Sequence, residues 1–265
     1  MIKNKQTKYI IASALLAVAV IFCLFSYNAS AQKLKNYKLH VEESYNHDAS
    51  AYTQGLFFHK GELYETTGQY GSSSIRKVDL KSGRVLNYVS VDKKYFAEGS
   101  CVLDGRMYVL TWMENVCFVY DIATLKKIGE LRNPREGWGI TTDGSSLIMS
   151  DGTNKIYYLD PLTFMEQKSV EVTLNGKKIN YINELEFIDG KIWANVYTTD
   201  TIIIINPKSG VVEGVVDCRN LLPYAMRRPN TDVLNGIAWD QSADAIYLTG
   251  KNWPRIFKIS LKEIK

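Results

Sequence analysis

The sequence predicts an all-β protein built from one repeated unit of four strands, and three observations favour this class. Short apolar runs of strand length, separated by turns rich in glycine, aspartate, asparagine and serine, follow one another from Tyr37 to the C-terminal end. No long segment of this region has the 3.6-residue period of an amphipathic helix. The strand–turn–strand pattern also returns at intervals of about 40–50 residues, which is the length of a blade in a β-propeller.

The first 31 residues are set apart from the repeats, because they have the layout of a secretory signal peptide. The segment begins with the basic residues Lys3, Lys5 and Lys8 and continues with an apolar run, Ile10–Phe25. It ends with Ala29-Ser30-Ala31, which places small residues at positions −3 and −1 of a cut after Ala31. Cleavage after Ala31 is expected, with an uncleaved membrane anchor as the alternative. The mature chain, residues 32–265, is then predicted to be an exported protein, periplasmic or secreted, with a single domain.

Charge and composition argue against several classes of function. Three of the positive charges behind the formal net charge of +4 lie in the leader, which leaves +1 for the mature chain and no reason to expect nucleic acid as a partner. The histidines argue against a histidine-based zinc site or a Ser-His-Asp triad, because they are only three and lie scattered near the N-terminus, at His40, His47 and His59.

The mature chain has three cysteines, so at most one disulfide can form within it, among Cys101, Cys117 and Cys218. The strand pattern predicts that Cys101 and Cys117 lie on neighbouring strands, where a bridge is feasible. The apolar sequence around both residues favours buried thiols instead.

Two independent landmarks define the repeat. The first is the turn between the first two strands of each unit, at Gly61, Gly105, Gly144, Gly190 and Asp244. The second is the polar residue at the end of the third strand, at Asp79, Asp121, Asp160, Asn206 and Ser260. The spacing between successive copies varies from 39 to 54 residues, and it varies in the same way for both landmarks. Five copies of a unit of this length predict a five-bladed β-propeller.

The outer strands predict how the ring closes. Four units continue into a fourth strand, at Arg84–Ser90, Lys126–Leu131, Glu166–Val172 and Val211–Asp217. The fifth unit ends after its third strand, so we expect Tyr37–Ser44 to join the last blade and to leave no open seam between the first and last blades. The longest spacing contains Arg219–Thr231, which is predicted to be an inserted loop or short helix.

Two sets of equivalent positions in the repeats predict a functional site at one rim of the central channel. Just before the first apolar strand, the five units carry Gln54, Glu98, Trp138, Asn183 and Asn235. Seven residues after the turn landmark, they carry Gly68, Trp112, Asp151, Tyr197 and Lys251. Together these positions describe a small pocket with aromatic walls, amides, an ammonium group and a carboxylate. The structural alternative is that the polar residues only satisfy turns and the aromatic residues only pack between blades.

Glu98 is the candidate for proton transfer, because it is the carboxylate of this set that is expected among the aromatic side chains. A carboxylate among aromatic side chains is costly to desolvate, so its pKa is expected to rise into the range that suits a general acid or base.

Long blocks of the sequence carry a family resemblance, namely YTQGL (52–56), YETTGQYGSSSIRKVDL (64–80), FAEGS (96–100), EGWGITTDG (136–144), SDGTNKIYYLDP (150–161), NELEFIDGKIWANVY (183–197), VLNGIAWD (233–240) and LTGKNWP (248–254). From about Tyr52 to Ile259 the chain resembles the glutaminyl-peptide cyclotransferases of the plant and bacterial type, typified by the papaya enzyme. The resemblance implies a five-bladed propeller. It also implies that the α-amine of an N-terminal glutamine attacks its own γ-carboxamide, which releases ammonia and leaves pyroglutamate.

The resemblance also implies roles for single residues. Glu98 would be the general acid and base, while Asn183 and Lys251 would bind the carboxamide oxygen and stabilise its charge. Gln54 would orient the substrate, and Trp112 and Trp138 would form the walls of its pocket. At two further substrate-binding positions the sequence departs from the papaya enzyme and carries tyrosine, at Tyr52 and Tyr197.

The expected partners are peptides and proteins with an N-terminal glutamine, and the expected state is a monomer without stable membrane association after cleavage of the leader. The resemblance implies no required cofactor, although a structural calcium ion in the channel is compatible with it. One alternative function is a non-catalytic binding or scaffold propeller. The other is a calcium-dependent hydrolase or lactonase, which would need several carboxylates in the channel, where Glu184 and Asp151 could join Glu98.

Overall fold

The computed structural model describes residues 34–264, so the predicted leader and its cleavage site lie outside the described residues. Apart from one 3-10 turn, Tyr224–Met226, all regular structure in this part of the chain is β-strand. That turn lies within the predicted insertion, Arg219–Thr231, which confirms a loop with a short helix there. Within residues 34–264, no helix is long and apolar enough to cross a membrane.

Three four-stranded sheets each follow the order of the chain. The first contains β2 (Thr53–His59), β3 (Glu62–Thr67), β4 (Ser74–Val78) and β5 (Val85–Ser90). The second contains β6 (Ala97–Leu103), β7 (Arg106–Thr111), β8 (Val116–Asp121) and β9 (Lys126–Arg132). The third contains β10 (Ile140–Thr142), β11 (Leu147–Ser150), β12 (Lys155–Leu159) and β13 (Glu166–Glu171). A two-stranded hairpin of β14 (Thr173–Leu174) and β15 (Lys177–Lys178) follows.

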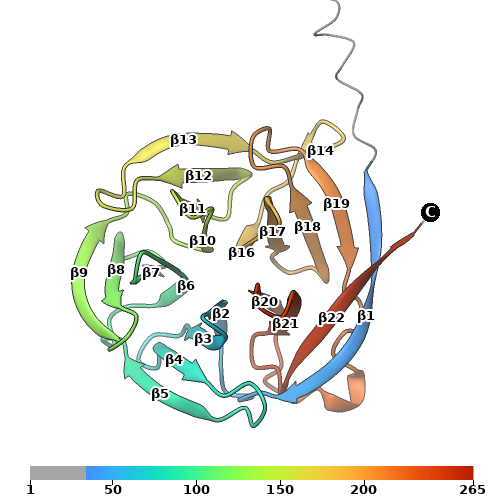
Figure 1. Ribbon diagram of the computed structural model, residues 1–265, viewed down its shortest axis with the longest axis horizontal. Coiled ribbons are helices and arrows are strands. Elements are labelled where there is room, and N and C mark those ends of the chain that lie inside the picture. The colour runs from blue at the N-terminus through green and yellow to red at the C-terminus, as the bar shows by residue number, and fades with distance from the viewer. Residues whose placement is uncertain (1–33, 265) are drawn as a thin grey trace, which may run out of the picture. The chain divides into compact units, whose positions relative to one another are not determined.

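The remaining eight strands form one sheet that joins two further groups of four. One group is β16 (Ile182–Ile188), β17 (Lys191–Val196), β18 (Thr201–Ile205) and β19 (Val212–Asp217). The other is β20 (Leu234–Asp240), β21 (Ala245–Gly250), β22 (Arg255–Ile264) and β1 (Lys35–Asn46). In Figure 1 all these groups lie around a common centre, with β2, β6, β10, β16 and β20 innermost. Each of these inner strands contacts the next one around the centre.

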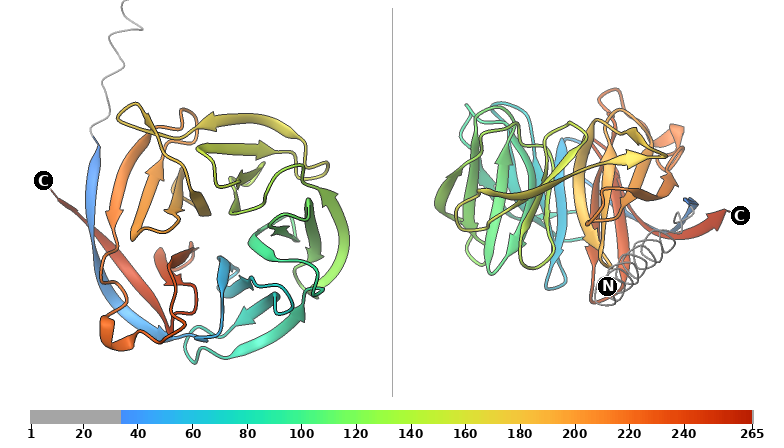
Figure 2. Two further views of the ribbon diagram at one scale, coloured as in Figure 1. Left: turned by 180° about the vertical axis from the view of Figure 1, so that it is seen from behind. Right: turned by 90° about the horizontal axis from the view of Figure 1, so that it is seen from above.

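Strand β1 completes the last group, as the sequence predicts. It pairs antiparallel with β22 from Asn36 opposite Ile264 to Asn46 opposite Arg255. Figure 2 shows the two strands side by side at the rim from the opposite direction. Beyond the prediction, the first residues of β1 also pair in parallel with β19, with Lys35 opposite Gly214. This second pairing explains why two groups of four strands form one sheet.

The hydrophobic core is divided among the spaces between neighbouring sheets. One cluster, for example, packs Phe57 and Ile75 of the first sheet against Met107 and Phe118 of the second. Both faces of a sheet are therefore covered by its neighbours, which accounts for apolar side chains on both sides of the inner strands.

The three described cysteines are buried and unbridged. Cys101 lies on β6 and Cys117 on β8, and β7 lies between these strands, so the expectation that they occupy neighbouring strands is wrong. The error arose because a whole strand, Arg106–Thr111, fits between the two cysteines. The alternative expectation of buried thiols holds, and burial raises the pKa of the Cys101 thiol well above its usual range.

Candidate active site

A small cavity lies at the end of the ring where the inner strands begin. Its volume is about 180 Å³, and its walls are Tyr52, Gln54, Gln69, Phe96, Glu98, Trp112, Trp138, Asn183, Tyr197 and Lys251. All eight residues that the sequence analysis assigned to catalysis or substrate binding are among these ten. Gln54, Glu98 and Asn183 each stand second in an inner strand. The following strands run in the opposite direction and end at this same edge. The residues directly after them are Trp112, Tyr197 and Lys251, which therefore lie at the same end as the first three.

The buried carboxyl group of this cavity belongs to Glu98, which is 6% exposed. Its Oε1 atom accepts a hydrogen bond of 3.1 Å from Nε2 of Gln54. Burial raises the pKa of Glu98 well above its usual range; the ammonium of Lys251 acts against this rise, and the carboxylates of Glu114 and Glu136 add to it. A carboxyl group whose pKa is raised by burial holds a proton more readily than an exposed one, which suits a group that must both take and give a proton.

The buried ammonium group belongs to Lys251, which is 4% exposed. Its Nζ atom lies 4.9 Å from the ring centre of Tyr52 and 4.9 Å from that of Tyr197, so two aromatic faces flank the positive charge. Burial lowers the pKa of Lys251, while the charges of Glu98 and Asp232 oppose that change. The group is therefore a cation with little water around it, which strengthens its action on nearby negative charge.

Asn183 adds a neutral donor to the same cavity. Its backbone carbonyl accepts a hydrogen bond of 2.7 Å from Oγ of Ser150, which fixes the start of β16 against β11. The side-chain amide is buried and makes no hydrogen bond to another described residue. It is therefore free to donate to a group that enters the cavity.

The aromatic wall is held together by one carboxylate outside it. Oε2 of Glu136 accepts hydrogen bonds from the indole nitrogens of Trp112, at 2.9 Å, and Trp138, at 3.0 Å. Trp138 also meets Tyr197 edge to face with ring centres 5.6 Å apart, and Trp112 meets Phe96 in the same way at 5.7 Å. The wall is thus a connected set of rings whose orientation is fixed before a ligand arrives.

The remaining predicted positions do not face the cavity. Asp151 accepts hydrogen bonds from Thr153 and from the hydroxyl of Tyr157, which satisfies a turn as the structural alternative predicted. Asn235 donates to the backbone carbonyl of Thr53 at 2.9 Å. Gly68 has an indirect part, because a Cβ atom there would lie 2.3 Å from the ring of Phe96, which the cavity needs in its present place.

Three residues near the site were missed by the sequence analysis. Phe96 stands two positions before Glu98, so the period-two rule for strands could have placed both side chains on one face. Gln69 lines the cavity from a turn with a positive φ of 91°, a conformation for which the sequence has no clear signal. Glu136 lies outside the cavity and accepts hydrogen bonds from both tryptophans. Its part in the site follows only from these two contacts, and no sequence pattern predicts it.

The channel below the cavity contains two further carboxyl groups, Glu184 and Glu186 on β16. The oxygens of Glu184 accept from the backbone nitrogens of Leu56 and Ile237, at 3.4 and 2.9 Å. Those of Glu186 accept from the backbone nitrogen of Trp239 and from Thr141. All four oxygens thus face hydrogen-bond donors, which is unlike a calcium site. Within residues 34–264, no three His, Cys, Asp or Glu side chains gather in a way that suits a metal ion.

A larger cavity, of about 710 Å³, lies at the opposite end of the inner strands and is lined by turn residues such as Asp143, Asp189 and Asp240. It is wide, and its carboxylates belong to separate turns; Asp143, for instance, caps its own turn through Ser145 and Ser146. The small cavity is the stronger candidate because a carboxyl group, an ammonium group and three amides converge there inside an aromatic wall.

Comparisons with known proteins agree with this choice. The family model for glutamine cyclotransferase matches residues 14–261. The glutaminyl-peptide cyclotransferase of Arabidopsis thaliana is 37% identical over 276 aligned positions, which cover 99% of this chain and 86% of that protein. The crystal structure of Myxococcus xanthus glutaminyl cyclase superimposes with a TM-score of 0.82 at 33% identity and covers 88% of this chain and 100% of that one. On the family match, the near-complete relative and the shared fold, this chain belongs to the glutamine cyclotransferase family.

Proposed function

We propose that the protein is a glutaminyl-peptide cyclotransferase, which converts the N-terminal glutamine of peptides and proteins into pyroglutamate and releases ammonia. Family membership supports the reaction. The observation that carries the assignment to this cavity is the convergence of Glu98, Asn183 and Lys251 in one enclosed space of about 180 Å³. No bound group is needed for the proton transfers below, so we propose an enzyme without a required cofactor, and equilibrium dialysis against calcium and zinc tests this point.

The reaction is intramolecular, so positioning supplies a large part of the rate. The α-amine nitrogen must attack the Cδ atom of its own side chain to form a five-membered lactam. A small cavity with fixed aromatic walls favours the folded side chain over extended conformers, and well-oriented intramolecular reactions gain several kcal/mol in this way, about 7–11 in favourable cases. Trp112, Trp138, Tyr52 and Tyr197 form these walls, and Gln54 orients the substrate beside Glu98.

Glu98 serves as general base and then as general acid. As a carboxylate it takes a proton from the attacking amine while the new C–N bond forms. It then gives that proton to the departing nitrogen as the old C–N bond breaks, so ammonia leaves and Glu98 returns to its starting state. Its raised pKa suits both halves of this cycle, because burial makes the carboxylate a stronger base toward the amine and the protonated form can then donate to the departing nitrogen.

Lys251 and Asn183 stabilise the intermediate. The carboxamide oxygen gains negative charge when the amine attacks, and a buried ammonium with a neighbouring amide donor favours that charge over the neutral starting state. The aromatic faces of Tyr52 and Tyr197 keep the ammonium in place and keep water away from it.

The architecture that we infer is a five-bladed β-propeller in one domain, residues 32–265. In support, five groups of four strands surround one centre, if the eight-stranded sheet is counted as two groups joined through β1. We also propose that residues 1–31 are a cleaved signal peptide and that the monomeric protein acts in the periplasm or outside the cell. Intact-mass analysis of the exported protein would locate the cleavage and would show whether Gln32 is itself cyclised.

Ammonia release from a small glutaminyl peptide tests the function directly. Glu98→Gln removes the titratable group with little change in shape, and we expect turnover to fall by roughly 10²-fold or more. Glu130→Gln is the matched control, because Glu130 lies on the outer strand β9, outside the cavity wall, and pairs with Lys127 instead; it should retain most of the activity. If the folded wild type turns over no glutaminyl peptide, the cyclase assignment is wrong and a binding propeller becomes the better interpretation.

A further inference from the structure

A second cavity adjoins the proposed active site. Its volume is about 560 Å³, and it shares two wall residues, Tyr52 and Gln69, with the smaller cavity. The cavity at the opposite end of the inner strands and the one beside β1 share no wall residue with the site. A peptide whose first residue is held in the small cavity must continue outward from it. The shared side chains make this second cavity, here called the exit groove, the adjacent space for that continuation.

The lining of the exit groove suits the main chain of a peptide. Besides Tyr52 and Gln69, it presents hydroxyl, amide and guanidinium groups, from Ser50, Thr67, Ser72, Arg76, Asn230 and Asn252. Each residue of an extended peptide brings one N–H and one C=O group that need partners. Few of the groove's side chains are apolar, so it offers hydrogen bonds and no deep pocket for a particular apolar side chain.

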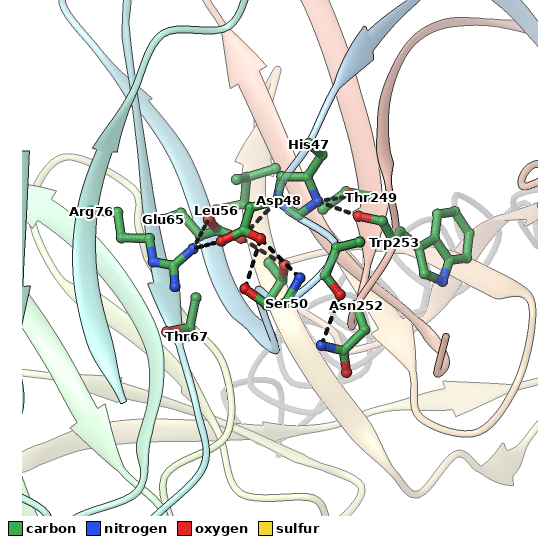
Figure 3. Close-up of polar contacts among 12 residues, drawn as sticks. His47, Asp48, Ser50, Leu56, Glu65, Thr67, Arg76, Thr249, Asn252 and Trp253 are labelled. Carbon is green, nitrogen blue, oxygen red and sulfur yellow. Dashed lines mark hydrogen bonds and ion pairs between the residues drawn. The ribbon is translucent and has the colours of Figure 1, made fainter. Parts of the chain in front are cut away.

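Arg76 is the part of the groove whose position is firmly fixed. The side chain is only 10% exposed. Its Nε donates to Oγ of Ser74 at 2.8 Å, and its Nη1 donates to Oδ2 of Asp48 at 2.8 Å, with Oε2 of Glu65 at 3.9 Å. In Figure 3 the dashed lines from the end of the Arg76 side chain start at only one of its two terminal nitrogens. The other, Nη2, donates no hydrogen bond to any described residue, so a fixed donor remains for a ligand.

The charges around the groove are nearly balanced. Arg76 is paired with Asp48, and Asp232 on the opposite side brings a second carboxylate, which accepts from the hydroxyl of Tyr52 at 3.1 Å. Behind Arg76, the buried Glu65 is paired with His47 at 2.9 Å. A groove with this balance has no strong reason to prefer acidic or basic side chains on the peptide.

We propose that the exit groove binds the main chain of the second and third residues of the substrate, with Nη2 of Arg76 donating a hydrogen bond to a substrate peptide carbonyl oxygen. The inference rests on the proposed cyclase function and deepens it. The preferred substrates are then peptides of at least three residues with broad tolerance for sequence after the glutamine. Free glutamine derivatives that lack a following residue are poor substrates by comparison.

A length series tests the groove separately from the chemistry. Ammonia release is measured for glutaminamide, Gln-Ala-amide and Gln-Ala-Ala-amide. We expect kcat/KM to rise by about 10-fold along the series, mostly through KM, since one or two added hydrogen bonds contribute about 1–2 kcal/mol. Gln-Glu-Ala-amide and Gln-Lys-Ala-amide should lie within about threefold of each other, as expected for weak charge effects at an exposed site.

Variants locate the effect. Arg76→Gln removes the donor, but it also leaves Asp48 and Glu65 without their partner and can unfold the protein, so a second variant is needed. Ser72→Trp places a bulky ring in the exit groove from an exposed position. The matched control is Ser242→Trp, because Ser242 is also exposed but follows β20 and lines the cavity at the opposite end of the inner strands. We expect Ser72→Trp to abolish the gain with length and to leave glutaminamide turnover within about twofold of wild type, while Ser242→Trp changes neither.

Each outcome has a separate meaning. A flat length series in an active wild type overturns the groove proposal and leaves the cyclase assignment intact. The same holds if Ser72→Trp lowers turnover of glutaminamide and of the three-residue peptide by equal factors. A preference of more than about 10-fold for one charge after the glutamine would also overturn it, because balanced charges do not produce that discrimination. Failure of every substrate with wild type would instead contradict the proposed function itself.

Discussion

At the scale of single residues, the cavity couples a carboxyl group and an ammonium group that burial affects in opposite ways. Burial disfavours the charged form of each, so the pKa of Glu98 is raised and that of Lys251 is lowered. Each charge partly offsets the effect of burial on the other group, because Lys251 lowers the pKa of Glu98 and Glu98 raises the pKa of Lys251. The protonation state of Glu98, the proposed general base, therefore depends on Lys251, which is also proposed to bind the substrate oxygen.

This coupling predicts the response of Glu98 to loss of the ammonium. In Lys251→Met the pKa of Glu98 should rise further, because the charge that lowers it is gone. Carboxyl ¹³C NMR across the acidic and neutral range measures the midpoint in the folded protein without using turnover. Lys94→Met, at a lysine outside the cavity wall, should leave that midpoint unchanged. An unchanged midpoint in Lys251→Met, or a wild-type midpoint like that of an exposed glutamate, would contradict the proposed arrangement.

The repeat led to seven of the eight assigned residues, because it makes positions comparable between units and equivalent positions in a ring meet at the same end. The eighth, Tyr52, was assigned from the family resemblance alone. The repeat pattern also placed residues in the site that do not face the cavity. Asp151 and Asn235 were included in the two sets, but Asp151 binds side chains of its own turn and Asn235 binds the backbone carbonyl of Thr53, which spacing cannot reveal. Gln69 was missed for the opposite reason, since it enters the cavity from an irregular turn outside the strand pattern.

At the scale of elements, the inner strands approach one another so closely that four of the five units need glycine beside the site residue, at Gly55, Gly99, Gly139 and Gly236. A Cβ atom on Gly139, for example, would lie 2.1 Å from the carbonyl oxygen of Asn183. The remaining unit, the fourth along the chain, carries Glu184 there, and its carboxyl group bridges two other inner strands across the channel. The convergence that builds the cavity is therefore also a packing constraint.

Two glycine substitutions test this constraint. Gly139→Ala should destabilise the protein by about 1–3 kcal/mol or more, because backbone atoms would have to move to admit the methyl group. Gly129→Ala on the outer strand β9 is the matched control, because the nearest atom to its Cβ would be 4.0 Å away; its effect should be within about 0.5 kcal/mol. Urea unfolding of both variants gives the comparison, and equal stabilities would contradict the proposed close approach.

Strand pairing shows where element-level prediction from the sequence ends. The outer strands and the return of the N-terminal segment to β22 follow from counting four strands in each unit. The parallel pairing of β1 with β19 does not, because it depends on how two outer strands happen to lie in space. The placement of Cys101 and Cys117 failed because the intervening β7 was left out of the count.

At the scale of the whole molecule, a buried ion pair joins the start of the described chain to its end and to the first sheet. Nε2 of His47, just after β1, lies 2.9 Å from Oε1 of Glu65 on β3, and Nδ1 lies 2.7 Å from the carbonyl oxygen of Trp253. Because both ring nitrogens face acceptors, the doubly protonated ring fits this place (Figure 3). Burial alone would lower the pKa of His47, but Glu65 and the carbonyl raise it overall.

This pair predicts how the stability of the ring depends on pH. The raised pKa of His47 stabilises the fold fully below its ordinary value of 6.5, and this contribution is lost as pH rises through the folded value. The pKa of Glu65 is lowered overall, since His47 and Arg76 outweigh its burial. Its contribution is present above the ordinary value of 4.5 and is lost as pH falls through the folded value. The pair should therefore stabilise the ring most between these two values.

Thermal unfolding of wild type and of the double variant His47→Gln, Glu65→Gln measures this window. The variant keeps side chains that can hydrogen bond but has no titrating charge at either position. We expect the difference in Tm to be largest between pH 4.5 and 6.5 and to shrink on both sides. A difference that does not change with pH would show that the pair is not charged in the folded protein.

The pairing of β1 with β22 also constrains the order in which the molecule can be completed. A ribosome makes residues 35–46 long before residues 255–264, yet each segment is the hydrogen-bonded partner of the other. Strand β1 must therefore wait for β22 before this pairing can form, and such a long-range contact makes closure of the ring a late step in folding. Until residues 255–264 have emerged from the ribosome, the ring of strands cannot close, so the nascent chain stays incompletely folded up to that point.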